Sequence, residues 1–305
     1  MKPALSIIFF TVASGAGLGL LALLALADLL LGGAGLSQGR MVAAAGLGIA
    51  LVAAGLASST LHLANPRNAW RAFSRFRTSW LSREAVFAVP FMLAAAGYFA
   101  ALAWAPGMER RPLAVVVVLL AWIVLYCTAM IYASLKPIRM WHTGLTPLCY
   151  QLFGHASASL LLAWIAGSGD TISGVFPKAA LVLLVLAAAA KLAWLRNAEK
   201  EGGSGIQSAL GQPTAAQVKL LDAGHTHGTF LTNEFVFKLA RTHAQRVRVA
   251  FWSATFVVPA VALAYFPDAL LGASLACLAG LVAERWLFFA EARHTVILYH
   301  GSQRS

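Results

Sequence analysis

Two ionisable residues flank a short basic segment, and their types and spacing suit proton and electron chemistry at a membrane edge. His62 precedes the segment, Glu84 follows it, and Arg67 and Arg71 lie between them. His62 lies at the end of one apolar run and Glu84 at the start of the next. Ionisable groups at membrane depth are costly and usually functional. A histidine can hold a carbonyl oxygen and pass a proton near neutral pH, and a partly buried glutamate can relay protons. A quinone ring, which takes up two electrons and two protons, needs such groups beside apolar walls, so these four residues predict a quinone-binding site.

A second polar cluster lies between residues 130 and 142, in the stretch Met130-Ile-Tyr-Ala-Ser-Leu-Lys-Pro-Ile-Arg-Met-Trp-His142. Tyr132, Ser134 and His142 are candidate members of the same quinone pocket. The stretch also matches the Tyr, Trp, Lys and Arg anchors found at membrane surfaces. The sequence leaves both interpretations open.

The basic segment itself predicts an amphipathic helix. Asn65 and Pro66 form a helix start, a capping side chain followed by proline in the first turn. Aromatic residues then recur at helical spacing among arginines, a pattern typical of a helix in the headgroup layer. They are Trp70, Phe73, Phe76 and Trp80. The alternative is a surface anchor without chemistry; for the two flanking ionisable residues to meet, the segment must bend, which we expect near Thr78.

Charged residues in the last apolar run and histidines elsewhere favour structural roles. Glu284 and Arg285 fall within an apolar helix, so we expect them to face protein and form ion pairs. A membrane haem needs two facing histidines within the spans; only His155 lies well inside one, so we expect no haem. The loop pair His225 and His227 lacks a cysteine or carboxylate partner, so we expect no metal site.

The composition shows which solvent the chain is built for. Of its 305 residues, 60% are hydrophobic and 11% are charged, whereas soluble domains carry about 25% charged residues. The net charge of +12 would suit nucleic acid only on a folded basic face, but the basic residues fill gaps between apolar runs. The three cysteines lie in or beside such runs and imply neither disulfides nor zinc. We therefore predict an all-α integral membrane protein without a nucleic-acid partner.

Eight apolar runs are long enough to cross a bilayer as helices, because about 20 residues span the hydrocarbon core. Lipid cannot satisfy free backbone groups, so helices are required. We predict a single transmembrane domain over residues 1–305, a bundle of eight transmembrane helices. The spans are expected near residues 4–31, 41–63, 85–105, 113–134, 147–166, 178–195, 248–266 and 269–291. The long loops, at residues 64–84, 135–146 and 196–247, all fall on the side of the two termini.

The basic residues indicate which side this is, because cytoplasmic loops are enriched in lysine and arginine. Of the 23 lysines and arginines, only Arg40, Arg110, Arg111 and Lys178 lie in loops of the opposite side. We therefore expect a multi-pass protein of the bacterial inner (plasma) membrane with both termini and the long loops in the cytoplasm.

Several blocks of residues, in this order and spacing, resemble one known family, the dimethyl sulfoxide reductase anchor subunit (DmsC) family. The blocks are Leu61-His62-Leu63, Pro66-Arg67-Asn-Ala-Trp-Arg71-Ala-Phe73, Ser82-Arg-Glu84, Lys136-Pro-Ile-Arg-Met-Trp141 and Glu284-Arg-Trp-Leu-Phe-Phe-Ala-Glu291. The last two resemble its branch associated with cytoplasmic sulfite dehydrogenase complexes (SoeC-like). The likeness covers nearly the whole chain.

The resemblance implies an eight-helix anchor without haem. Family members bind a four-cluster ferredoxin-like iron–sulfur subunit, which joins a molybdopterin catalytic subunit, so the clusters and molybdopterin belong to the partners. They exchange electrons between the nearest cluster and a membrane quinone, ubiquinone or menaquinone. In the family, a histidine before the basic loop and a glutamate after it matter for quinol binding; here these match His62 and Glu84. Basic loops would meet an acidic surface on the iron–sulfur subunit, and the candidate docking residues are Arg75, Arg77, Lys136 and Arg139.

The expected function is therefore that of a quinone-reactive anchor subunit without substrate chemistry of its own. The expected position of the long loops in the cytoplasm favours the sulfite-oxidising branch of the family, in which oxidation of sulfite is coupled to reduction of quinone. The alternative is the quinol-oxidising anchor of a dimethyl sulfoxide reductase-type enzyme, whose catalytic subunits are periplasmic. A secondary transporter is the rival from another class, but the mid-membrane charges and paired broken helices that transporters use are scarce.

Overall fold

The computed structural model describes residues 4–32, 35–60, 66–105, 107–167, 174–200 and 239–295, and these residues form helices and connections without a strand. Eight helical stretches in this part are long and apolar enough to cross a membrane, which confirms the predicted bundle of eight transmembrane helices. The long helices are α1 (Leu5–Leu31), α2 (Gln38–Thr60), α3 (Trp80–Trp104), α4 (Arg111–Ala133), α5 (Leu145–Ala166), α6 (Val175–Lys200), α9 (Leu239–Trp252) continued by α10 (Val258–Tyr265), and α11 (Leu270–Ala290).

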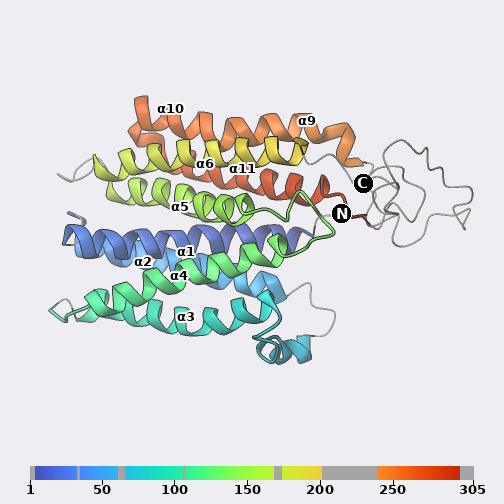
Figure 1. Ribbon diagram of the computed structural model, residues 1–305. Helices are drawn as coiled ribbons and strands as arrows, with labels where there is room; N and C mark the ends of the chain where they lie inside the picture. Colours follow the sequence, from blue (N-terminus) through green and yellow to red (C-terminus); the bar gives the residue numbers. More distant parts are fainter. Residues whose placement is uncertain are drawn as a thin grey trace, which may run out of the picture.

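The first helix, α1, runs through the middle of the bundle (Figure 1). It packs against α2, α4, α5 and α11. Its most apolar window is 78% buried, against 22–67% for the other seven spans. A helix that is hydrophobic all round is suited to such a position.

Glycines let the neighbours of α1 approach its backbone closely. A Cβ atom on Gly17 would lie 2.6 Å from the carbonyl oxygen of Gly48 on α2. A Cβ on Gly154 of α5 would lie 2.8 Å from the carbonyl oxygen of Gly15. Small residues at helix contacts are the usual means of tight packing in membranes, and here they bring two helices against α1.

The buried apolar residues form two hydrophobic cores, and α1 contributes to both. One lies mainly among α1, α2, α3 and α4 and contains Phe91 and Tyr98; the other lies mainly among α5, α6, α9 and α11 and contains Phe251 and Phe288. Large apolar side chains also cover the outside of the bundle, for example Leu93, which is 70% exposed. An apolar outer surface of this kind suits contact with acyl chains.

The seventh span, residues 243–265, changes its winding in the middle. Between α9 and α10 lies a π-helical turn, η2 (Ser253–Val257), and Pro259 follows it in the first turn of α10. Proline has no N–H for a helical hydrogen bond and its ring clashes with the carbonyl four residues earlier, so a wider turn accommodates it. Gly280 of α11 packs against this turn, since its Cβ would lie 2.8 Å from the nitrogen of Thr255.

One end of the bundle carries the start of α1 at Leu5, the start of α3 at Trp80 and the end of α11 at Ala290 (Figure 1). We call this end the terminus face. Before α3, a short 3-10 helix, η1 (Pro66–Phe73), lies at the same end. The terminus face therefore holds most of the residues predicted to form the site.

Candidate functional site

Glu84 lies in the second turn of α3, close to the terminus face, and its side chain is buried. The helix begins at Trp80 because Ser79 caps it: the Ser79 hydroxyl oxygen accepts a hydrogen bond from the N–H of Ser82 at 3.4 Å. From the sequence, this span was expected to begin near residue 85. The earlier start carries Glu84 into the helix and against a neighbouring helix.

The carboxyl of Glu84 is held by a hydroxyl of α4. Thr128 is buried, its hydroxyl contacts Oε1 of Glu84, and the same hydroxyl lies 3.0 Å from the carbonyl oxygen of Val124. A hydroxyl has one proton to donate and lone pairs to accept with. When Glu84 is protonated it can donate to Thr128, which donates to Val124; when it is ionised, Thr128 can donate to it. The pair can therefore hold or release a proton at Oε1.

Arg83 fixes the chain just before this helix. Its Nε donates to the carbonyl oxygen of Phe76 at 3.0 Å and its Nη2 to that of Arg77 at 2.9 Å. Its guanidinium carbon lies 4.1 Å from the ring centroid of Trp80, a cation–π contact. Arg83 thus holds the turn at residues 74–78 against the start of α3, while Arg75 and Arg77 remain exposed.

Arg67 and Arg71 lie on the 3-10 helix η1 and are exposed. The N–H of Ser74 bonds to the carbonyl of Arg71 at 3.1 Å, three residues back, and turns follow to residue 78. The expected amphipathic α-helix is therefore a 3-10 helix followed by turns, so the chain changes direction before Thr78. Trp70 stays exposed beside the two arginines, as a surface segment rich in aromatics and cations requires.

His62 lies outside the described residues, which stop at residue 60 and resume at residue 66. Its position relative to Glu84 stays a prediction.

Tyr132 stands at the centre of an aromatic cluster near the end of α4. Its ring centroid lies 5.5 Å from that of Trp141, 5.9 Å from Tyr150, 5.6 Å from Phe288 and 5.4 Å from Phe289. The ring of Tyr150 is stacked on it, and the other three meet it edge to face. Tyr132 is one helical turn from Thr128, so both belong to one face of α4.

Ser134 and His142 lie at the rim of the terminus face. Ser134 caps the end of α4, is exposed, and donates to the carbonyl oxygen of Ile131 at 3.4 Å. His142 is also exposed, and its Nδ1 lies 2.7 Å from the carbonyl oxygen of Ala133. Because a carbonyl only accepts, Nδ1 carries the proton, and a neutral His142 presents Nε2 as an acceptor.

The structure thus divides the predicted quinone-site residues into two groups. Glu84 and Tyr132 are on α3 and α4, which pack together inside the bundle. The described residues of the second group lie on the surface at the terminus face: Arg67, Arg71, Ser134 and His142. Thr128 and Tyr150, which were not predicted from the sequence, connect the inner group to its surroundings.

The loop between α4 and α5 presents the two other candidate docking residues. Lys136 and Arg139 are exposed. Trp141 is buried and anchors the loop by donating from Nε1 to the carbonyl oxygen of Phe288 at 3.1 Å, and the N–H of Thr295 bonds to the carbonyl of Pro137 at 3.0 Å. The two cations therefore project from a loop that is fixed to the end of α11.

A group of three charged side chains is buried between α6 and α11. Glu284 contacts Nζ of Lys191 through Oε1 and Nε of Arg285 through Oε2. The ion pairing expected for Glu284 and Arg285 is present, but Lys191, assigned by sequence to the cytoplasmic side with the loop cations, is a buried third member. Aromatic rings cover both cations, with Nζ of Lys191 3.9 Å from the centroid of Trp194 and the Arg285 guanidinium carbon 4.1 Å from that of Tyr150.

His155, the histidine deepest in a span, has protein partners at both ring nitrogens. Nδ1 lies 2.7 Å from the carbonyl oxygen of Gln151, and Nε2 accepts from Nε1 of Trp122 at 3.0 Å. Within the described ranges, no group of three His, Cys, Asp or Glu side chains is arranged to hold a metal ion.

The opposite end of the bundle carries a separate ion pair. Arg110 donates to both carboxylate oxygens of Asp28, from Nε at 2.7 Å and from Nη2 at 2.8 Å, and the hydroxyl of Tyr98 donates to Oδ2 at 3.0 Å. The hydrogen bond to Asp28 raises the pKa of the Arg110 guanidinium. This bidentate pair ties the start of α4 to the end of α1.

Two comparisons relate the chain to known proteins. The family model described as "DMSO reductase anchor subunit (DmsC)" matches residues 1–290. The chain is also 34% identical to a sulfite dehydrogenase subunit of Allochromatium vinosum, over 99% of this chain and 99% of that protein. Both likenesses extend over all eight spans and the site at the terminus face.

Proposed function

Because the chain belongs to the DMSO reductase anchor subunit (DmsC) family, we propose that it links a molybdopterin oxidoreductase to the quinone pool. In this proposal an iron–sulfur subunit of the four-cluster ferredoxin-like type docks on the terminus face and joins a molybdopterin catalytic subunit. Electrons then pass between the cluster nearest the membrane and a quinone. The chain itself carries no substrate chemistry.

The buried Glu84–Thr128 pair is the observation that carries the proposal. A quinone supplies two-electron chemistry when bound, and each two-electron reduction also consumes two protons. Glu84 can hold or release a proton at Oε1, and within the described residues no lysine or arginine forms an ion pair with it. A carboxyl with a neutral partner can change protonation without breaking an ion pair, which suits a proton carrier.

The position of this pair suits a lipid-soluble partner. α3 is at the outer edge of the bundle (Figure 1), and Leu81 and Leu93 on it are exposed. A long isoprenoid tail can therefore approach the start of α3 from the acyl chains. We propose that Tyr132 and His62 complete the hydrogen-bonding surroundings of the ring, with Arg67, Arg71, Ser134 and His142 at its entrance.

The exposed cations of the terminus face suit an acidic protein surface. Arg75 and Arg77 project from the turn held by Arg83, and Lys136 and Arg139 project from the loop held by Trp141. Complementary charge speeds encounter and fixes orientation. We propose that these four cations contact the iron–sulfur subunit.

The relative from Allochromatium vinosum is a sulfite dehydrogenase subunit, and the excess of basic residues at the terminus face favours the cytoplasm. We propose that the chain lies in the inner membrane with both termini in the cytoplasm, and that sulfite oxidation there reduces quinone. In the alternative, the same site oxidises quinol and electrons flow in the opposite direction, to the catalytic subunit of a reductase.

The test compares the full complex in lipid nanodiscs with the complex lacking this subunit. Sulfite-dependent reduction of a short-chain ubiquinone should require this chain, whereas reduction of soluble ferricyanide should not. Equal quinone reduction without the subunit would overturn the proposal. Quinol-dependent reduction of dimethyl sulfoxide, without activity on sulfite, would reverse the direction.

A further inference from the structure

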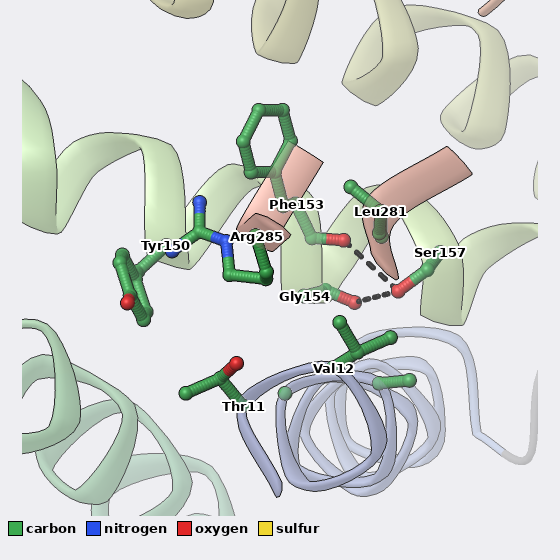
Figure 2. A pocket seen from close by; sticks show the side chains of 10 residues that line it. Thr11, Val12, Tyr150, Phe153, Gly154, Ser157, Leu281 and Arg285 are labelled. Atoms are coloured by element: carbon green, nitrogen blue, oxygen red, sulfur yellow. Dashed lines mark hydrogen bonds between the residues drawn. The ribbon is translucent and has the colours of Figure 1, made fainter. Parts of the chain in front are cut away.

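The interior of the bundle has little room for a ligand where α1, α5 and α11 meet. The cavity there has a volume of about 20 Å³, and most of its lining is apolar, including Val12, Phe153 and Leu281 (Figure 2). Even one water molecule needs about 10–15 Å³ of such space, so this cavity is too small for a lipid headgroup. The surface of the terminus face offers a ligand more room.

The segment before α3 carries a concentrated positive charge. Between Asp28 and Glu84 the chain contains six arginines and no acidic residue, and five of these arginines fall within residues 67–83. Arg67 and Arg71, both on η1, are exposed, and no described carboxylate forms an ion pair with either. Their charge is therefore available to an anion from outside the chain.

This segment is fixed to α3 rather than hanging free. The ring of Phe76 lies 5.8 Å from that of Phe87 on α3, and the N–H of Arg75 donates to the hydroxyl oxygen of Ser82 at 3.2 Å. Together with the two bonds of Arg83 described above, these contacts hold η1 at the terminus end of α3. Figure 1 shows it as the short blue-green helix at the outer edge of the bundle.

The 3-10 winding of η1 sorts its side chains along separate edges. Because residues three apart are eclipsed in such a helix, Arg67, Trp70 and Phe73 align on one edge, and Arg71 lies on the next. Trp70 is 64% exposed and Phe73 is 48% exposed, whereas Ala72 on the third edge is partly covered. The guanidinium carbon of Arg71 lies 5.8 Å from the centroid of the Trp70 ring. Cations and large aromatic rings are thus presented together.

This combination matches the chemistry of a lipid headgroup. A guanidinium presents a planar fork of donors that fits a phosphate group, and tryptophan favours the boundary between headgroups and acyl chains. The outer side of α3 continues the site into the membrane, because Leu81, Val89 and Leu93 are exposed at spacings of four or eight residues and so share one helix face. Acyl chains can lie along this face while the phosphate stays beside η1.

We propose that η1 is a binding site for an anionic phospholipid. Arg67 and Arg71 hold its phosphate, and Trp70 and Phe73 enter the boundary between headgroups and acyl chains. A zwitterionic lipid also has a phosphate, but its own cation offsets the attraction. Each arginine should favour an anionic over a zwitterionic lipid on the order of fivefold. The site needs only the membrane and does not depend on the quinone chemistry proposed above.

Quenching of tryptophan fluorescence by brominated lipids tests the site in the full chain, reconstituted in phosphatidylcholine nanodiscs. Either brominated phosphatidylglycerol or brominated phosphatidylcholine is titrated in, with the bromines near the headgroup end of the acyl chain. The signal of Trp70 is the difference between wild type and Trp70→Phe. It should be quenched at a several-fold lower fraction of the anionic lipid than of the zwitterionic one. Equal quenching by the two lipids would overturn the proposal.

Trp122 provides a matched control, since it is 40% exposed in the middle of α4. Its signal, obtained from Trp122→Phe in the same way, should not distinguish the two lipids. The same preference at Trp122 as at Trp70 would show a general enrichment of anionic lipid around the chain and would overturn the assignment to η1.

Charge variants test the role of the two arginines. The double variant Arg67→Gln/Arg71→Gln should lose the preference of the Trp70 signal for the anionic lipid. Arg71→Lys keeps the charge and should retain most of it, which separates the effect of charge from damage to η1. Arg111→Gln, at the opposite end of the bundle, should leave it unchanged. A preference that persists in the double variant would overturn the proposal.

Addition of the iron–sulfur subunit separates a lipid from a protein partner. With a lipid on η1, the preference of the Trp70 signal for brominated phosphatidylglycerol should persist in the complex, because Arg75 and Arg77 on the following turn remain for the protein. Loss of quenching by both lipids on complex formation would show that the iron–sulfur subunit covers η1 and would overturn the proposal.

Discussion

The hydroxyl of Thr128 on α4 contacts Oε1 of Glu84 on α3, and both side chains are buried. The contact places a titratable group inside a membrane helix pair with a neutral partner. A buried carboxyl of this kind is expensive unless it has a use. Changes to either partner should therefore affect quinone chemistry more than assembly.

Glu84→Gln should abolish proton exchange at this position while keeping the shape of the side chain and an acceptor for Thr128. We expect quinone-coupled turnover to fall by about 10²-fold or more, as for loss of a general acid–base group, with assembly of the complex intact. Sulfite-dependent quinone reduction in membranes measures the loss. Glu109→Gln is the control, because Glu109 is exposed at the other end of the bundle. Wild-type turnover in Glu84→Gln would show that Glu84 does not belong to the quinone site. His62→Leu should also lower turnover, and wild-type turnover in that variant would contradict the assignment of His62.

Thr128→Val replaces the hydroxyl by a methyl group of similar size. The carboxyl of Glu84 then loses its partner, which costs about 1–3 kcal/mol for a buried acceptor. We expect quinone-coupled turnover between that of wild type and Glu84→Gln, with a reduced thermal midpoint. Thr128→Ser retains the hydroxyl and should recover both properties. If Thr128→Ser failed as Thr128→Val did, packing of the methyl group would be the cause.

Glu284→Gln removes the carboxylate shared by Lys191 and Arg285 and leaves two buried cations without compensation. Breaking a buried pair in this way typically costs about 3–5 kcal/mol, so we expect little folded protein in membranes. Glu291→Gln is the control, at the C-terminal end of the same helix: its partner Arg248 lies 2.7 Å away and is 42% exposed, so the cost should not exceed about 1 kcal/mol. Fluorescence-detected gel filtration and thermal midpoints in detergent measure both. Equal yields would contradict the structural role of Glu284.

Charge reversal at Arg75, Arg77, Lys136 or Arg139 should weaken docking of the iron–sulfur subunit. Exposed charges act mainly on the association rate, so the loss should be largest at low ionic strength and shrink as salt rises. Co-purification and binding kinetics at several salt concentrations measure it. Arg111→Glu is the matched control, since Arg111 is exposed at the opposite end. A larger loss for Arg111→Glu would place the partner on the other face.

A reporter fused after Ser305 tests the orientation. We expect a reporter that works only in the cytoplasm to be active there, and a reporter that works only in the periplasm to be active when inserted at Gly107, in the loop between α3 and α4. A periplasmic signal from the C-terminal fusion would invert the topology and move the docking face outside.

The spans were predictable because lipid requires long apolar helices, and run length alone identifies these. Which helices pack together was not predictable, because contacts between helices join residues far apart in the chain. Lys191 illustrates this: near the end of its run it resembles a surface cation, and only Glu284, on another helix, explains its burial. The 3-10 winding of η1 was also missed, since the spacing of Trp70 and Phe73 is compatible with either helix.

Glu84 was predictable as an ionisable residue at the edge of an apolar run, whereas Thr128 gave no signal. A threonine within an apolar run is common and usually bonds its own backbone, as Thr128 also does with Val124. Tyr150 was missed for a similar reason, because its importance comes from the cation above its ring and the ring of Tyr132 stacked on it.

The central position of α1 has a consequence for biogenesis. This helix is synthesised before α2, α4, α5 and α11, which enclose it, and α11 begins only at Leu270. The newly inserted α1 must wait in lipid, or beside an insertase, until α11 arrives to close around it. Nascent chains truncated before Leu270 should therefore be captured by membrane quality control, however well their earlier helices insert.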